Sequence, residues 1–187
     1  MIDQLTLKSI YNLLSLNSDR INTSVIKDTN EEIRWVFVFN IDGLQGDVGI
    51  TQYGQWGVNC PGNFCILDRY ESLLYFIYLL EAPFEDIQKK LRSGLENDIE
   101  RIDFNGIFPF FEIVMFVFEY KVSDYWINLA FEWYNHFLFL EKKSLKEAIE
   151  RLSISHITSQ KTRHRAKKAL KVLKELEAEY ERSFVCR

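Results

Sequence analysis

Glycine is unevenly distributed along this chain, and its distribution restricts where a sheet and where helices can form. Six of the eight glycines lie between Gly43 and Gly62. Glycine weakens helices but allows tight turns and close approach of two backbones. Asp42-Gly43 is typical of a turn, and residues 48–52 then alternate apolar and small or polar side chains as a strand does. We therefore expect a small sheet with tight turns here.

Three further segments favour strands. The clearest is Glu31–Ile41, which is dense in β-branched and aromatic residues and is expected to be buried on both faces and central in the sheet. Its predicted first face carries Ile33, Trp35, Phe37, Phe39 and Ile41, and its second carries Val36 and Val38. Trp56–Cys60 and Asn63–Ile66 are expected to supply another short strand or a hairpin.

Helical patterns precede and follow this region. Apolar residues between Leu5 and Leu16 predict a short amphipathic helix. From Asp68 onward, an apparent capping box at 68–71 predicts a helix to Leu80, and Pro83 suits the first turn of the next helix, which ends near Gly94. Phe110–Tyr120 is compatible with a helix or a strand.

The remaining helices are predicted from their start signals. Asp124 is expected to cap an aromatic helix reaching Leu140, and a second capping box at 144–147 opens a helix to Leu152. The last helix should run from about Thr158 to Ser183, with a narrow stripe of apolar residues for packing. The whole is an α+β fold, mainly α, with a small antiparallel sheet in the first third followed by packed helices and a long C-terminal helix. We expect one domain over residues 1–187, with a helix and small sheet in 1–67 and a helical part in 68–187.

Composition and cysteine content indicate a cytoplasmic protein. The N-terminus has no secretory signal pattern, and the longest apolar stretches are too short to span a bilayer. Three cysteines, Cys60, Cys65 and Cys186, do not form the even, closely spaced set of a secreted disulfide framework. Whether Cys60 and Cys65 ever pair is left open.

Motifs of catalysis are not found. The chain lacks a phosphate-binding loop, a nucleophile elbow, C-x-x-C and H-E-x-x-H, and its three histidines are far apart. Glu132 and His136 are interpreted as helix-surface charges or a satisfied hydrogen bond, since the sequence lacks the Glu-x-x-His pairs that a di-iron bundle needs on two helices. We expect no enzyme activity, no cofactor and no metal.

The charge is divided along the chain. Residues 1–141 hold 10 basic and 21 acidic side chains, whereas residues 142–187 hold 13 basic and six acidic ones. The run Lys161–Lys174 has seven lysines and arginines and no acid, and Lys161, Arg165 and Lys168 share one helical face that can neutralise phosphates. Because the helix continues into glutamates at 175, 177, 179 and 181, a solvated or internally paired face is the preferred interpretation, and nucleic acid is not the expected partner. A membrane role is not expected, because the opposite stripe is alanine-rich.

Acidic and aromatic residues outside this run are candidates for contact with a protein partner. Tyr53 and Trp56 lie in the glycine-rich region near two acidic residues, where exposed aromatics would form a binding patch, although Trp56 can equally cover the core. The candidate partner-binding residues are Asp42, Asp47, Tyr53, Trp56, Glu96, Asp98, Glu100 and Asp103.

In general character this acidic, aromatic-rich, motif-free chain resembles the immunity proteins that protect bacteria from polymorphic or contact-dependent growth-inhibition toxins. The resemblance implies a tight complex with a cognate toxin domain, often a basic nuclease whose active site is covered. The basic C-terminal segment departs from a uniformly acidic inhibitor. The alternative function is a nucleic-acid-binding regulator that uses the basic C-terminal helix.

Overall fold

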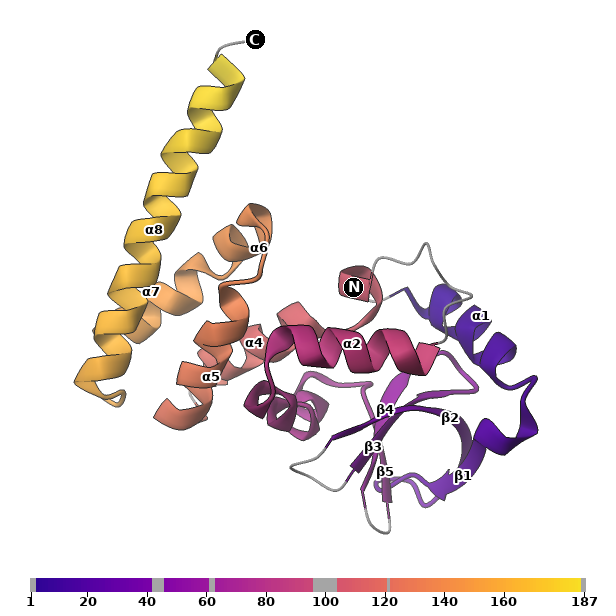
Figure 1. The fold of residues 1–187 in the computed structure, drawn as a ribbon. Helices are drawn as coiled ribbons and strands as arrows, with labels where there is room; N and C mark the ends of the chain where they lie inside the picture. Colours follow the sequence, from indigo (N-terminus) through magenta and orange to yellow (C-terminus); the bar gives the residue numbers. More distant parts are fainter. Residues whose placement is uncertain (1–2, 42–45, 61–62, 96–103, 121, 186–187) are drawn as a thin grey trace. The chain divides into compact units, whose positions relative to one another are not determined.

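The computed structural model describes residues 3–41, 46–60, 63–95, 104–120 and 122–185 (Figure 1). Contacts within the chain group it into two compact units, Met1–Phe110 and Phe111–Arg187, and each is described by itself. The predicted α+β class is confirmed: an antiparallel sheet lies in the first third, and helices follow, the last of them long. The expected single domain with a division near residue 67 stays a prediction.

The five strands of the sheet pair in chain order, each antiparallel to the next. They are β1 (Ile21–Val25), β2 (Glu32–Ile41), β3 (Gly46–Thr51), β4 (Trp56–Cys60) and β5 (Asn63–Ile66). Strand β2 has a neighbour on each side, as predicted. Strand β1 was not predicted, because its five residues are short of apolar side chains and resemble a loop in composition.

The sheet curls until its first and last strands meet. An isolated parallel bridge joins Ile26 to Phe64, and the backbone N–H of Lys27 donates to the carbonyl of Phe64 at 3.1 Å. Figure 1 shows β1 and β5 close together as a result. The curled sheet encloses a small apolar cluster of Ile33, Trp35 and Phe64.

Two glycines make room for the aromatic rings inside this curl. The ring centroids of Trp35 and Phe64 lie 5.1 Å apart. A Cβ atom on Gly49 would stand 2.3 Å from the Trp35 ring, and one on Gly57 would stand 2.2 Å from the Phe64 ring. Any side chain at either position would therefore overlap an aromatic ring of the cluster.

Part-buried polar groups at this cluster are paired by a short series of hydrogen bonds. The indole N–H of Trp35 donates to the Ser24 hydroxyl at 3.0 Å, and that hydroxyl donates to Oδ1 of Asn59 at 3.0 Å. These hydrogen bonds link β2 to β1 and β4, so they fix the tryptophan ring and also pair the polar groups.

Strand β2 does not keep the predicted strict alternation. The register against β3 shifts between Phe37 and Phe39, which marks a bulge. Phe39 remains buried, whereas 38% of Phe37 is exposed, so Phe37 does not belong to the buried face assigned to it. The extra residue explains why Val38 and Phe39 are both buried although they are adjacent.

Helices α1 (Gln4–Leu14) and α2 (Phe84–Leu95) pack against the sheet. Each helix ends within a few residues of its predicted end. Helix α1 buries Leu7, Ile10 and Leu14. Helix α2 approaches β2 closely at Gly94, where a Cβ atom would lie only 1.9 Å from the carbonyl oxygen of Val38. Short helical segments η1 (Ser18–Arg20) and α3 (Phe104–Ile107) complete the unit.

The helix predicted from residue 68 to Leu80 is replaced by two 3₁₀ segments, η2 (Tyr70–Tyr75) and η3 (Ile77–Glu81). Leu73, Phe76 and Leu79 are buried at a spacing of three residues, which matches the three residues per turn of a 3₁₀ helix. The predicted capping box also does not form. Asp68 accepts instead from the Ser72 hydroxyl, at 3.3 Å.

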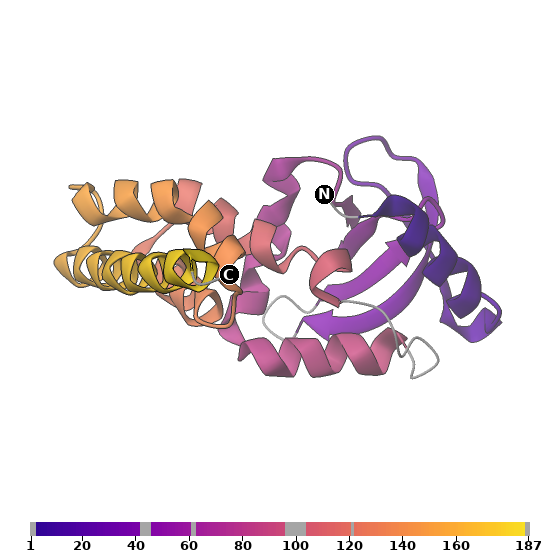
Figure 2. The same ribbon diagram turned by 90° about the horizontal axis from the view of Figure 1, so that it is seen from above.

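Helices form the described part of the second unit. They are α4 (Phe110–Tyr120), α5 (Asp124–Tyr134), α6 (Phe139–Ser144), α7 (Lys146–Ile154) and α8 (Gln160–Val185). Residues 110–120 are thus a helix and not a strand. Figure 2 shows α8 beside α7, and the buried side chains of α8 include Thr162, Ala166 and Leu173.

Two predicted helix starts in this unit are wrong in detail. Ser123, and not Asp124, caps α5, with its hydroxyl accepting from the N–H of Trp126. The aromatic helix ends at Tyr134, well before Leu140, and α6 begins after a turn. The predicted box at 144–147 does not form, because the Ser144 hydroxyl donates backward to the carbonyl of Leu140 at 3.0 Å.

We predict that Gly57→Ala destabilises the first unit by about 1–3 kcal/mol, because the new methyl group overlaps the Phe64 ring. In the Gly57→Ala/Phe64→Leu double variant the smaller side chain relieves the overlap, so the two losses should not add. Urea unfolding of the wild type, both single variants and the double variant measures this coupling. The exposed change Thr23→Ala is the control, and strictly additive losses would contradict the enclosed ring.

Candidate functional site

The structure describes only part of the predicted partner-binding set. Asp42, Glu96, Asp98, Glu100 and Asp103 lie outside the described residues. Asp47 is half-buried on β3 and accepts from Nδ2 of Asn40 on the paired strand at 3.0 Å. Its carboxylate therefore already has a partner within the sheet.

The two predicted aromatic residues have opposite environments. Trp56 is only 1% exposed, and its indole N–H donates to the carbonyl of Ile107 at 2.6 Å. Its ring also packs edge-on against Phe108, with centroids 5.0 Å apart. The prediction that Trp56 forms an exposed binding patch is therefore wrong, since the residue belongs to the core. Tyr53, in the turn between β3 and β4, is 56% exposed.

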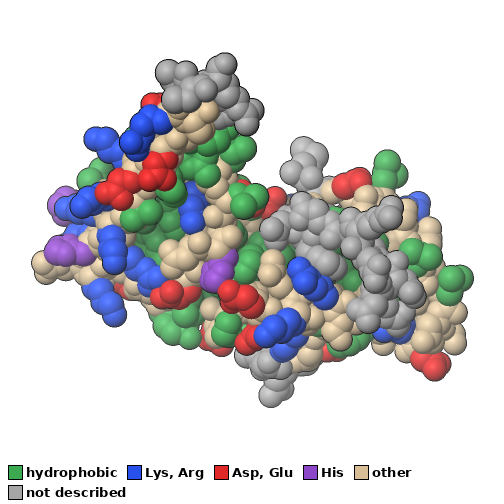
Figure 3. Space-filling model, turned by 45° about the horizontal axis from the view of Figure 1, so that its top comes forward, with side chains coloured by type: hydrophobic (Ala, Val, Ile, Leu, Met, Phe, Trp, Pro, Cys, Tyr) green, Lys and Arg blue, Asp and Glu red, His purple; other side chains and the backbone are tan. Residues whose placement is uncertain are grey.

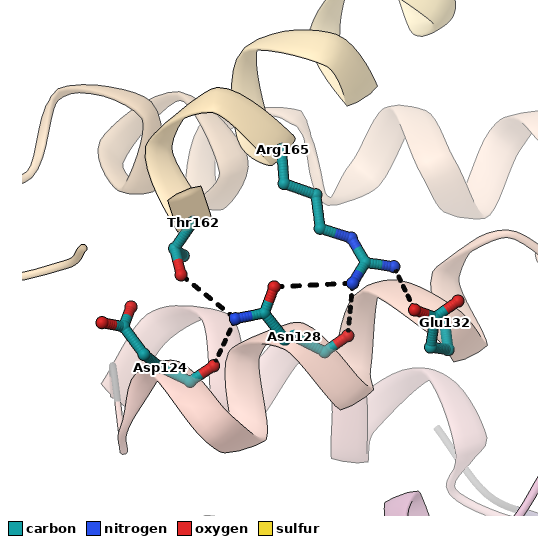
Figure 4. Close-up of polar contacts among 5 residues, drawn as sticks. All are labelled: Asp124, Asn128, Glu132, Thr162 and Arg165. Atoms are coloured by element: carbon teal, nitrogen blue, oxygen red, sulfur yellow. Dashed lines mark hydrogen bonds and ion pairs between the residues drawn. The ribbon is translucent and has the colours of Figure 1, made fainter. Parts of the chain in front are cut away.

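The three predicted phosphate-contacting residues of α8 also differ from one another. Lys161 and Lys168 are exposed, but Arg165 reaches back to α5 (Figure 4). Its guanidinium donates to the carbonyl of Asn128 at 3.0 Å and to the carboxylate of Glu132 at 2.7 Å. It also lies over the Phe131 ring, 5.2 Å from the centroid. Arg165 therefore fixes α8 onto α5.

Polar side chains of α5 extend this contact to the start of α8. Asn128 donates to the hydroxyl of Thr162 at 3.2 Å, and Figure 4 shows both residues between Asp124 and Arg165. The carboxylate of Asp124 accepts from the backbone N–H of Ser159 at 2.9 Å, directly before α8 begins. Hydrogen bonds from Thr162 and then Ser159 hold the pKa of Asp124 below its ordinary value.

With one side of α8 attached in this way, six cationic or titratable side chains point outward. We call them the basic face: Lys161, His164, Lys167, Lys168, Lys171 and Lys174. All six are exposed, and none has an ion pair or hydrogen bond with the described part of the chain. Figure 3 shows blue and purple side chains gathered at its left.

Internal pairing was one interpretation of the basic run Lys161–Lys174. It holds for the arginines of the run but not for its lysines. Arg163 donates to the carbonyls of Ser155 and Thr158, and Arg165 is paired as described above. The sequence identified the basic run but not the division within it. At about 100° per residue, the lysines fall on the side opposite Ala166 and Leu173, and this helical position was the available signal.

Metal binding, thiol reactivity and small-molecule binding are the other kinds of chemistry considered for the described residues. They contain no group of three His, Cys, Asp or Glu side chains that could hold a metal. Cys60 and Cys65 are free thiols on neighbouring strands, and burial raises the pKa of both, which lowers the fraction of reactive thiolate. A cavity of about 140 Å³ in the first unit is lined by Asn40, Tyr78, Glu81, Lys90 and neighbouring apolar residues. It is smaller than typical ligand sites.

We predict that Asp124→Asn lowers the free energy of unfolding at pH 7 by about 1 kcal/mol, because a carboxylate beside the first free N–H groups of α8 is lost. The folded pKa of Asp124 lies below its unfolded value, so the stabilisation is complete above that unfolded value and disappears as the pH falls through the folded pKa. Urea unfolding of both proteins from pH 7 to pH 2.5 measures the difference. The exposed Glu179→Gln is the control, and a difference independent of pH would contradict the assignment.

Among the described residues, no helix combines the length and apolar character needed to cross a membrane. Comparison with known proteins finds no matching family model, no matching curated protein and no matching solved structure.

Proposed function

We propose that this chain is a cytoplasmic immunity protein that binds and neutralises a cognate toxin domain through its first unit. The observation that carries the proposal is a set of exposed apolar side chains on the N-terminal helix and next to it. We call it the α1 surface: Leu5, Leu13, Leu16 and Tyr53. Of these four residues, only Tyr53 was predicted from the sequence, because the apolar pattern of α1 does not distinguish its buried leucines from its exposed ones.

The turn that carries Tyr53 is fixed to the first turns of α1. Gln4 donates from Nε2 to the carbonyl of Tyr53 at 3.0 Å. Gly54 has a φ of +74°, and a Cβ atom there would lie 2.4 Å from the carbonyl of Gln4 and 2.8 Å from the amide nitrogen of Lys8. A side chain displayed from such a turn loses little entropy when a partner binds it.

Helix α1 is apolar on two sides. Its inner side is buried against the sheet, yet Leu5 is 78% exposed and Leu16, just after the helix, is 84% exposed. Exposed large apolar side chains, among them an exposed tyrosine, are typical of protein interfaces. An aromatic residue on a rigid support is also the usual form of a binding hot spot.

The charge of the first unit favours a basic partner. Residues 1–110 hold sixteen acidic and nine basic side chains. Such an excess increases the association rate with a positively charged protein. A nuclease toxin fits this description, because a domain that holds nucleic acid needs a positive cleft.

The proposal predicts that a toxin domain is encoded beside the gene for this chain, and that domain is the protein used in the test. Co-expression should rescue growth, and the purified proteins should form a stoichiometric complex. Tyr53→Ala/Leu16→Ser should weaken the Kd by about 30-fold or more, because a hot-spot residue contributes about 2 kcal/mol or more. Isothermal titration calorimetry measures the Kd, with circular dichroism to establish that the variant is folded.

The second unit offers a matched control in Leu138→Ser/Leu140→Ser, which removes two exposed leucines from the region of α6. This variant should retain the wild-type Kd. An adjacent toxin that is neither bound nor neutralised would contradict the proposed function. Equal losses in both double variants would contradict the placement of the partner on the α1 surface.

A further inference from the structure

We propose that the basic face of α8 is a second interaction surface, which binds the phosphate backbone of nucleic acid without reading its sequence. This proposal does not rest on the toxin complex. It arises from residues of the second unit alone, and it concerns the side chains that remain unpaired once α8 is attached to α5 and α7.

The dimensions of the face match a row of phosphates. Lys161 and Lys174 are 13 residues apart, which corresponds to about 20 Å along a helix. The four other members lie between them, so a charge or a titratable imidazole occurs about every turn. Because the side chains have no partner among the described residues, phosphate binding would not have to break existing ion pairs. Condensed counterions released from nucleic acid would then contribute to binding.

The residue types indicate contact with the backbone rather than with bases. Arginine reads guanine through its planar fork, whereas lysine acts as a point charge on phosphate. The two arginines of this run, Arg163 and Arg165, are both engaged in contacts within the second unit. The side chains left free are lysines and one histidine. The structure therefore favours binding that is insensitive to sequence.

An anionic membrane and an acidic protein fit the face less well. A helix that lies in a membrane surface inserts an apolar stripe, but the stripe of α8 includes Ala166 and Leu173, which are buried within the unit. A protein interface needs aromatic or aliphatic anchors at its centre, and the six residues of the basic face supply none. Phosphate binding, by contrast, requires only the positive charges of the basic face.

The test is fluorescence anisotropy with labelled 20-base-pair DNA duplexes of two unrelated sequences, using the full chain. If all five lysines contact phosphates, the affinity should fall by about 500-fold between 50 and 200 mM salt, following the slope of about −0.9 per contact. The two sequences should bind within about twofold of each other, because phosphate contacts carry no sequence information.

The variant Lys161→Glu/Lys168→Glu/Lys171→Glu leaves two lysines on the face. Its affinity at 50 mM salt should fall at least tenfold, and its salt dependence should shrink to about 12-fold over the same range. The control Lys8→Glu/Lys89→Glu/Lys143→Glu changes the net charge equally at exposed positions away from the face, and it should retain most of the wild-type affinity and the wild-type salt slope. Circular dichroism establishes that both variants fold.

Three results would overturn the proposal. The first is no binding of the wild type to either duplex at 50 mM salt. The second is an equal loss in the test and control variants, which would indicate an effect of net charge alone. The third is tighter binding to phosphatidylserine-containing vesicles than to DNA, with the same loss in the test variant, which would assign the face to a membrane.

Discussion

The first unit depends on the enclosure of Trp35 inside a sheet of only five short strands. The Trp35 ring fits because Gly49 has no side chain where the ring lies, and the Phe64 ring beside it fits because Gly57 has none. The curl that follows brings β1 to β5 and pairs Ile26 with Phe64. It also sets the curvature of β2 and β3, on which α1 packs. The exposed residues of α1 and the turn of Tyr53, which joins β3 to β4, are thus supported by these strands.

In the second unit, a small set of polar contacts decides which charges are available to a partner. Arg165 and Asp124 connect α5 with α8 at one end, and Lys146 pairs with Glu177 at 3.1 Å farther along the helix. These contacts fix the rotation of α8 about its own axis. A rotation of half a turn would expose Ala166 and Leu173 and bury several lysines without partners, at a large desolvation cost. The basic face is therefore a consequence of how the helix is docked.

The sequence predicts the class of fold well because that information is local. Clustered glycines and the β-branched run around Trp35 indicate a sheet, and the heptad-like spacing after Thr158 indicates a long helix. The bulge at Phe37 and the 3₁₀ turns after Tyr70 depend on packing against distant residues, so local propensity misses them. The apparent capping box at 144–147 fails for a local reason: Ser144 is the last residue of α6, and its hydroxyl donates to the carbonyl of Leu140 in the same helix.

The candidate sites show the same division between local and nonlocal information. Charge composition identifies the basic run at residues 161–174, but it groups Arg165 with Lys161 and Lys168 because the three are equivalent on a helical wheel. Only the position of α5 separates them. Trp56 was misplaced because a tryptophan beside acids and glycines has the composition of an interface, whereas its acceptor, the carbonyl of Ile107, is 51 residues away in the chain.

The two units carry opposite net charge, so the two proposed surfaces favour partners of opposite charge. The acidic excess of residues 1–110 attracts a basic protein and repels nucleic acid, whereas the basic face does the reverse. At about 0.15 M salt the Debye length is about 8 Å, so each surface acts mainly on a partner that is already near it. A basic nuclease and a nucleic acid therefore need not compete for the same side chains. The residues that the two proposals require are thus distinct: the α1 surface belongs to the first unit, and the basic face belongs to the second.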